Sequence, residues 1–155
     1  MSYDQPSNEY FMQQALNEAK QAFLEGEVPI GAVLVKDGQL LVSDHNRKEQ
    51  LGSATAHAEK LVIERANKLV GNWRLTGCQL FVTIEPCVMC CGAIIQSRLP
   101  ELFYGAKDPK FGAVASLYHV LEDSRANHFV SVQGGLMADE AASLMQDFFR
   151  KLREN

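Results

Sequence analysis

The chain has 155 residues, of which 15 are basic and 19 acidic, giving a formal net charge of −4 at pH 7. This balance argues against a protein that coats nucleic acid without specificity. The apolar runs, such as residues 30–35, are far too short to span a bilayer. Residues 1–6 carry neither the basic nor the apolar segment of a secretory signal, so we expect one cytoplasmic domain over residues 1–155, with no membrane contact.

Hydrophobic periodicity predicts helices and strands along the whole chain. Residues 9–25 carry apolar side chains at helical spacing and end at Gly26, a typical helix cap. Two β-rich runs, 30–35 and 39–43, flank Asp37-Gly38, which is a two-residue hairpin signal. The later elements are predicted in the order helix, strand, helix, strand, strand, helix, over residues 57–69, 79–84, 87–97, 101–104, 128–132 and 139–152.

This order of elements predicts an α/β fold with three α-β-α layers around a central mixed five-stranded sheet. The sequence contains no internal repeat and no Pro/Gly/Ser-rich linker that would mark a domain boundary. In sheets of this kind, functional sites gather where the starts of helices face the ends of strands.

Two motifs place chemistry at the starts of two predicted helices: His57-Ala-Glu59 and Pro86-Cys87-Val-Met-Cys90. One imidazole and two thiolates make three metal ligands, and no fourth ligand is apparent. A structural zinc is usually enclosed by four protein groups, whereas a catalytic zinc keeps one position for water. The motifs therefore favour a catalytic zinc with Glu59 beside it as the group that moves protons.

The spacing supports this chemistry. Cys87 and Cys90 are three residues apart on a predicted helix and project to one side. The positive end of the helix dipole favours their thiolate forms, which bind metal. Zinc-activated water next to a carboxylate is suited to adding hydroxide to a C=N carbon with loss of ammonia.

Other interpretations remain for the cysteines. A single Cys-x-x-Cys also occurs in redox pairs and in structural zinc sites, and a structural zinc or RNA-binding module would take a fourth ligand such as Cys91. Cys91 is otherwise expected to be a small packed side chain beside the site, and Cys78 a small buried one.

The two motifs resemble those of the zinc-dependent nucleoside and nucleobase deaminases, the cytidine-deaminase-like superfamily. Within it, the chain is similar to the bacterial tRNA-specific adenosine deaminases over nearly its whole length. The segments that carry this similarity are 27–35, 45–47, 85–90, 92–94, 104–108 and 147–150. The resemblance implies hydrolytic deamination of adenosine to inosine at wobble position 34 of an arginine tRNA, by a homodimer that binds the tRNA across both subunits.

The resemblance also implies roles for individual residues. His57, Cys87 and Cys90 would bind one Zn2+ per subunit, and Glu59 would be the catalytic proton shuttle. Three residues would bind the flipped base, with Asn46 as its hydrogen-bond partner and Val28 and Ile84 as pocket walls. A further set would contact the anticodon stem-loop: Asp108, Lys110, Asn127, Phe148, Phe149 and Arg150. No DNA partner is expected.

Several of these residues also have a purely structural interpretation. Asn46 fits a turn after the hairpin, and Asp108 fits a loop cap beside Pro109. Phe148 and Phe149 point about 100° apart on a helix, so one is expected to pack inside while the other faces RNA.

A free nucleobase or nucleoside deaminase, acting on guanine, cytosine or cytidine, is the alternative function, because it would use the same zinc motifs. The closing helix discriminates between the two functions. A small-molecule enzyme would use it to cover the pocket, while an RNA enzyme needs an open mouth flanked by Lys and Arg.

Overall fold

A mixed five-stranded sheet in the order β2-β1-β3-β4-β5 organises the computed structural model, which describes residues 6–154. The expectation of no secretory signal concerns residues 1–5 in particular, and these lie outside the described residues. Strands β1 and β2 are antiparallel, β1 is antiparallel to β3, and β3, β4 and β5 are parallel. The strands are β1 (Gly31–Lys36), β2 (Gln39–His45), β3 (Cys78–Ile84), β4 (Glu101–Ala106) and β5 (Ser131–Gln133).

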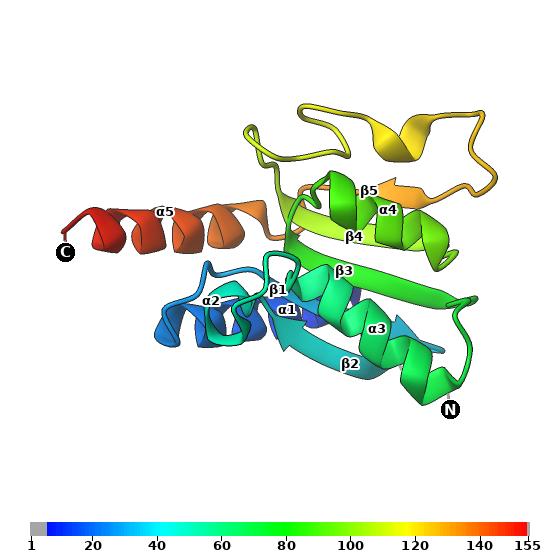
Figure 1. Ribbon diagram of the computed structural model, residues 1–155, viewed down its shortest axis with the longest axis horizontal. Helices are drawn as coiled ribbons and strands as arrows, with labels where there is room; N and C mark the ends of the chain where they lie inside the picture. Colours follow the sequence, from blue (N-terminus) through cyan, green and yellow to red (C-terminus); the bar gives the residue numbers. More distant parts are fainter. Residues whose placement is uncertain (1–5, 155) are drawn as a thin grey trace.

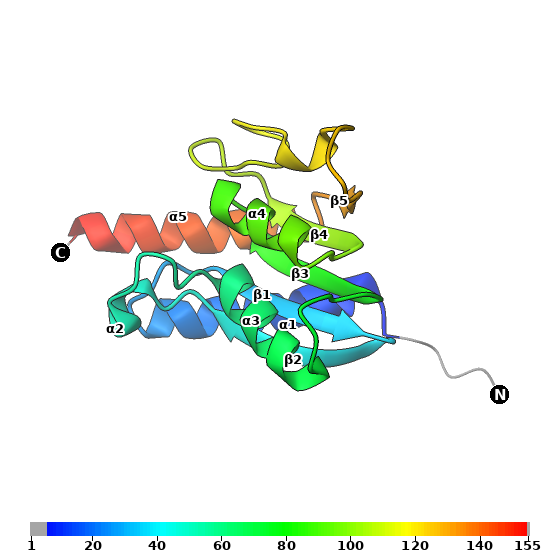
Figure 2. The same ribbon diagram turned by 45° about the vertical axis from the view of Figure 1, so that its right-hand side comes forward.

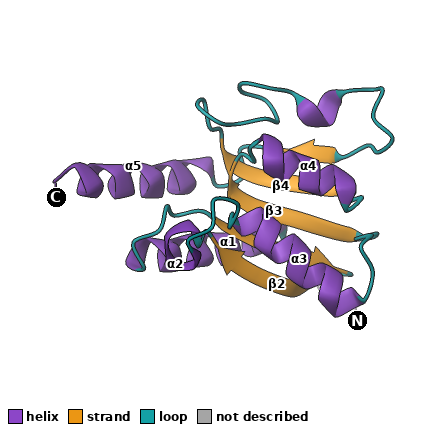
Figure 3. Cartoon of the chain, in the orientation of Figure 1, coloured by secondary structure: helices purple, strands orange, loops and turns teal. Residues whose placement is uncertain are grey.

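Four long helices cover the two faces of the sheet, and Figures 1 and 2 show the resulting layers. Helices α1 and α5 lie on one face, while α3 and α4 lie on the other. A short helix α2 follows β2, and a 3-10 turn η1 lies in the connection between β4 and β5 (Figure 3). The helical bounds are α1 (Asn8–Leu24), α2 (Lys48–Leu51), α3 (Ala58–Val70), α4 (Val88–Gln96), η1 (Val120–Glu122) and α5 (Ala138–Glu154). No helix in residues 6–154 is long and apolar enough to cross a membrane.

Successive side chains of β1 point to opposite faces of the sheet and join the apolar core on each face. Ala32 and Leu34 pack with α3 and α4, whereas Val33 and Val35 pack with α1, as the period of two in a strand requires. Both sets are fully buried, which explains the nearly unbroken apolar run of β1. Gly31, at the start of β1, lies directly against α1, because a Cβ there would lie 2.0 Å from the backbone oxygen of Ala15.

The structure confirms the predicted α/β class and the five strands, and it corrects several bounds. Strand β2 runs on to His45, and the short helix α2 was not predicted. The predicted strand 128–132 is wrong at its start, because β5 begins at Ser131 and pairs with only three residues of β4. His57 and Cys87 precede their helices as N-cap residues instead of lying inside them.

The strand directions bring several segments to one edge of the sheet. The ends of β2, β3 and β4 lie there with the start of β1, because β1 runs opposite to all three. Helices α3 and α4 begin at this edge (Figure 1). The carboxyl edge therefore gathers the positions where the sequence motifs are found.

Candidate active site

Three side chains converge at the starts of α3 and α4. The Nδ1 atom of His57 lies 3.6 Å from Sγ of Cys87 and 3.6 Å from Sγ of Cys90. A tetrahedral zinc, bonded to sulfur at about 2.3 Å and to nitrogen at about 2.0–2.1 Å, sets those ligand atoms about 3.5–3.6 Å apart. All three donors lie within 4.8 Å of one another, so they fit a tetrahedral dication.

The local backbone explains why these side chains are available. His57 and Cys87 are both N-cap residues with extended backbone, and neither side chain makes a capping hydrogen bond. An N-cap side chain projects over the first turn of its helix, where unpaired N–H groups favour negative charge. Cys90, one turn along α4, is fully buried beneath them.

The surroundings of Cys87 favour the thiolate form of its side chain. Hydrogen bonds from Cys90 and His57 lower the pKa of Cys87 to about 4. The pKa of Cys90 is raised, because its proton is held by the hydrogen bond to Cys87 and by burial. The hydrogen bond to Cys87 also raises the pKa of His57. A metal ion that binds here would displace the proton shared by these side chains and would take the thiolate as a ligand.

Glu59 lies in the first turn of α3 and is not one of the three converging donors, His57, Cys87 and Cys90. Its side chain is 4% exposed, and burial raises the pKa of its carboxyl group. A raised pKa makes a carboxylate a stronger proton acceptor, and the acid it becomes can pass that proton on, which is the property a proton shuttle needs.

The remaining cysteines do not join this cluster. Cys91 is fully buried, with its Sγ 3.9 Å from the backbone oxygen of Pro86, and burial raises the pKa of its thiol to about 12. Cys78 is fully buried at the start of β3. Both match the prediction of small packed side chains. Within residues 6–154 the His57 cluster has no fourth protein ligand, which argues against the closed structural zinc module.

Asn46, the predicted hydrogen-bond partner of the base, directly follows β2. Its side-chain amide donates to the Val28 carbonyl at 3.4 Å, and its Oδ1 accepts from the Lys48 N–H at 3.3 Å. It therefore serves the turn after β2, as its structural interpretation expected. The next N–H in the chain, that of Arg47, donates to the Ala56 carbonyl, so the turn lies against the residues that lead into His57.

Ile84 ends β3 at the same edge and is buried. A hydrogen bond of 3.1 Å from the Gly31 N–H to the Thr83 hydroxyl ties the start of β1 to this strand end. The predicted base-binding residues Asn46, Val28 and Ile84 thus share one edge of the sheet with the metal donors.

The loop after β4 carries two predicted RNA contacts. Lys110 is exposed, while one carboxylate oxygen of Asp108 accepts the N–H groups of Lys110 and Phe111. Asp108 is therefore a loop cap. The Ala113 N–H donates to the Pro86 carbonyl at 2.9 Å, which places this loop beside Cys87.

The two adjacent phenylalanines of α5 have different surroundings. Phe148 is half-buried and packs edge-on against Phe23 of α1, with ring centroids 5.8 Å apart. Phe149 is 39% exposed, and Arg150 is exposed and paired with Asp147. This division agrees with the expectation that one ring packs inside, and contact of the other ring with RNA stays a prediction.

Asn127 is not brought to this edge. It is exposed in the connection that leads to β5. The next residue, His128, bonds to the carbonyl of Leu99, which lies just before β4 begins. That is the opposite end of the strand from the metal donors, so a contact between Asn127 and an anticodon loop stays a prediction.

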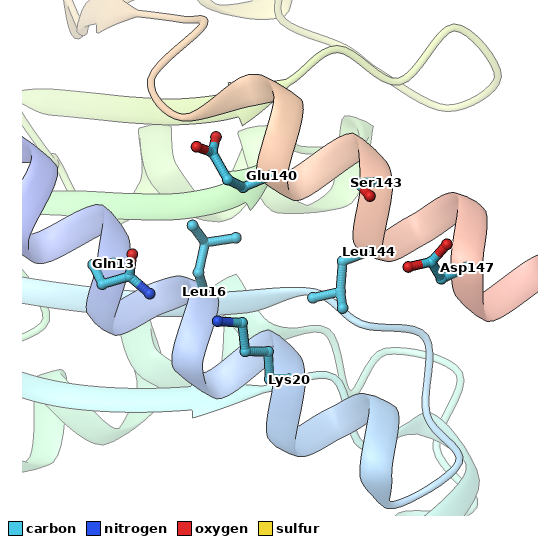
Figure 4. Close-up of a pocket in the computed structure, with 7 residues that line it drawn as sticks. All are labelled: Gln13, Leu16, Lys20, Glu140, Ser143, Leu144 and Asp147. Atoms are coloured by element: carbon cyan, nitrogen blue, oxygen red, sulfur yellow. The ribbon is translucent and has the colours of Figure 1, made fainter.

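A hollow of about 230 Å3 lies between α1 and α5 (Figure 4). Leu16 and Leu144 extend into it from the two helices, with Lys20 and Asp147 at its margin. A second hollow of about 430 Å3 lies beside β5 and includes Tyr104 and Phe129. Neither contains the metal donors, so both are separate from the candidate site.

A second group of donors was not predicted from the sequence. Atoms of Glu18, Asp44 and His45 also lie within 4.8 Å of one another. These donor atoms already have hydrogen-bond partners in the protein. His45 bonds to Glu18 and to Glu25, and Asp44 bonds to Arg47 at 2.7 Å. This cluster is a buried ion-pair network that joins α1 to the end of β2.

Two buried carboxylates were also missed. Glu27 accepts the N–H groups of Glu49 and Gln50, and Glu85 accepts those of the loop after β4. Burial would raise the pKa of Glu85, but hydrogen bonds from Ala115, Ser116 and other loop residues outweigh it, so the pKa is lowered. In the sequence, each acid stands beside a predicted pocket residue, Val28 or Ile84, and begins a segment that carries the family resemblance, 27–35 or 85–90.

Comparison with known proteins identifies the family. The model of the MafB19-like deaminase family matches residues 6–153. The tRNA-specific adenosine deaminase of Streptococcus pyogenes serotype M1 is 51% identical over 99% of this chain and 90% of its own length. A solved structure from studies of A-to-I editing by tRNA:A34 deaminases at the wobble position superposes with a TM-score of 0.83 and 46% identity, covering 86% of this chain and 97% of the other.

A guanine deaminase from Nitrosomonas europaea shares the fold, with a TM-score of 0.80, 24% identity and coverage of 92% of this chain and 84% of the other. At that identity the likeness concerns the fold alone. The family model over residues 6–153 and the 51% identity over 99% of the chain show that the chain belongs to the tRNA-specific adenosine deaminase family.

Proposed function

We propose that this protein converts adenosine to inosine at wobble position 34 of an arginine tRNA, by hydrolysis that releases ammonia. The observation that carries the proposal is the trio His57, Cys87 and Cys90, with both sulfur atoms 3.6 Å from Nδ1 of His57 and buried Glu59 in the same helical turn. The 51% identity to a tRNA-specific adenosine deaminase over 99% of the chain supports the same substrate.

The three donors would hold one Zn2+ per subunit. When bound, the zinc supplies a positive charge that makes water acidic near neutral pH. The protein moves the protons. Glu59 takes a proton from the water as the water oxygen bonds to C6 of adenine, and it protonates the ring nitrogen. It then takes the second proton from the new hydroxyl on C6 and delivers it to the amino group, so that the C6–N bond breaks, C6 becomes a carbonyl, and ammonia leaves with inosine remaining.

The base would enter at the edge where Val28, Asn46 and Ile84 meet. A flipped adenine needs apolar walls and a polar partner for its edge. Val28 and Ile84 supply the walls. The amide of Asn46, whose bonds to Val28 and Lys48 are long at 3.4 and 3.3 Å, would exchange one of them for the base.

The orientation of α5 favours RNA over a free nucleobase. In Figures 1 and 2 this helix extends outward past the edge of the sheet, and its ribbon does not cross in front of the starts of α3 and α4. Its exposed Phe149 and Arg150 offer a stacking surface and a charge. With Asp108, Lys110 and Asn127 they are the proposed contacts to the anticodon stem-loop. A homodimer that acts on tRNA in the cytoplasm completes the proposal.

The test is inosine formation at one nucleotide. Unmodified arginine tRNA with adenosine at position 34 is incubated with zinc-loaded protein, and the product is digested and analysed by mass spectrometry. A tRNA with guanosine at that position is the matched control. Adenosine, guanine, cytosine and cytidine are run in parallel, and turnover of one of these without inosine in tRNA would replace the proposal with the nucleobase alternative.

A further inference from the structure

Glu85 makes a set of contacts that the proposed reaction does not use. It follows β3 directly, is 3% exposed, and accepts five hydrogen bonds that all come from one loop. Its Oε1 accepts from the Asp108 N–H at 3.0 Å and from the Ser116 hydroxyl at 2.5 Å. Its Oε2 accepts from the N–H groups of Val114, Ala115 and Ser116 at 2.8–3.0 Å. A buried carboxylate is stable only with such partners.

The loop, residues 108–116, is closed tightly around this carboxylate. A Cβ on Gly112 would lie 2.4 Å from Cδ of Glu85 and 2.5 Å from the Asp108 oxygen, so only glycine fits there. The Ala113 N–H adds a bond to Pro86, the residue before Cys87. The position of loop 108–116 is thereby fixed relative to the start of α4.

The outer side of the same loop carries groups suited to RNA. Phe111 is 68% exposed, and Lys110 beside it is exposed as well. An aromatic ring can stack on an unpaired base and an ammonium can pair with phosphate. Six backbone and side-chain groups of the loop turn inward, toward Glu85 or Pro86, which leaves Lys110 and Phe111 as its outward face.

We propose that Glu85 is a positioning residue that clamps loop 108–116 against the zinc-binding end of α4, so that Phe111 and Lys110 contact nucleotides beside the flipped adenosine. This inference rests on the proposed function. It assigns Phe111 as a contact and gives Glu85 a role in binding RNA, without a part in the chemistry.

The test compares Glu85→Gln with wild type. The amide oxygen of Gln can keep some of the N–H partners, but its NH2 group faces donors, so the loop must loosen. On an anticodon stem-loop RNA we expect KM to rise about tenfold, because an unclamped loop must be ordered on binding, while kcat changes less than about twofold. Zinc content stays at one per chain, and faster amide hydrogen exchange is confined to residues 108–116.

Two further variants test the inference independently of Glu85→Gln. Gly112→Ala displaces the loop with Glu85 intact, so it should reproduce the KM rise even where Glu85→Gln fails to fold. Phe111→Ala should raise KM while hydrogen exchange of the loop stays unchanged. Glu122→Gln, an exposed acid in the same connection, is the control and should match wild type.

An unchanged KM in Gly112→Ala and Phe111→Ala would overturn the inference. Loss of zinc or of kcat alone in Glu85→Gln would also overturn it, because Glu85 would then serve the metal centre. Inactive wild-type protein would instead refute the proposed function, and the RNA role of the loop with it. The exchange experiment would still decide whether Glu85 holds the loop.

Discussion

The carboxylate of Glu27 lies 2.8 Å from the backbone nitrogen of Gln50 and 3.0 Å from that of Glu49. Glu27 is 1% exposed and precedes Val28, while its two partners lie in the first turn of helix α2, which begins two residues after Asn46. An acid from the loop after α1 thus caps the first turn of α2. It holds the two sides of the proposed base-binding edge together.

Glu27→Gln should therefore weaken the fold and the site together. The amide leaves one N–H of α2 without an acceptor, which costs about 1–3 kcal/mol of unfolding free energy. Denaturant unfolding measures this loss, and Glu49→Gln, which changes an exposed side chain and keeps the N–H, is the control. Equal stability of the two variants would show that the cap contributes little.

Glu59→Gln should abolish inosine formation, with a loss of at least about 100-fold, because the amide cannot accept the proton. Zinc should stay bound at one ion per chain, since Glu59 is not among the three converging donors. Metal content by atomic spectroscopy and inosine by mass spectrometry are measured on the same sample. Glu64→Gln, an exposed acid on the same helix, is the control. Loss of metal from Glu59→Gln would make Glu59 a ligand.

Cys87→Ser and Cys91→Ala should differ in metal content. Cys87 supplies a donor atom, so its loss should release zinc. Cys91 lies against Pro86 and contributes packing, so Cys91→Ala should keep zinc and lose about 1 kcal/mol of unfolding free energy. Zinc loss from Cys91→Ala would favour the structural zinc module over the enzyme.

The sequence predicted the convergence of His57, Cys87 and Cys90 because these donors lie in two short motifs at helix starts. His57 and Glu59 share one motif, as do Cys87 and Cys90. Local periodicity also predicted every strand of the sheet. These features depend on neighbours a few residues apart, and their spacing is visible in the chain itself.

What sequence reasoning missed depends on contacts between distant residues. Helix α2 has four residues, too few for a periodic signal, and its cap comes from Glu27, 22 residues earlier. The clamp by Glu85 joins residues 23–31 positions apart. All three residues of strand β5 are exposed, and the strand is defined by its pairing with β4, so its own sequence overestimates its length.

Acid should release the contacts that Glu25 makes with the end of β2 and with helix α2. Hydrogen bonds from Gln50 and His45 hold the pKa of Glu25 at about 2, below its ordinary value of 4.5. A lowered folded-state pKa stabilises the protein fully above pH 4.5, and this contribution is lost as pH falls toward 2. Urea unfolding should therefore show the stability difference between wild type and Glu25→Gln shrinking through this window. A difference that is constant from pH 7 to pH 3 would exclude this ionisation as its source.

Phe148→Ala and Phe149→Ala should separate packing from RNA binding. Phe148 packs on Phe23, so its loss should reduce the free energy of unfolding by about 1–2 kcal/mol. Phe149 exposes 39% of its surface, and its removal should leave stability within about 0.5–1 kcal/mol of wild type. It should instead weaken binding of the anticodon stem-loop about fivefold or more, because stacking on a base contributes about 1–3 kcal/mol. Fluorescence anisotropy with labelled RNA measures the affinity. If Phe149→Ala binds as wild type does, the outward face of α5 is not part of the RNA surface.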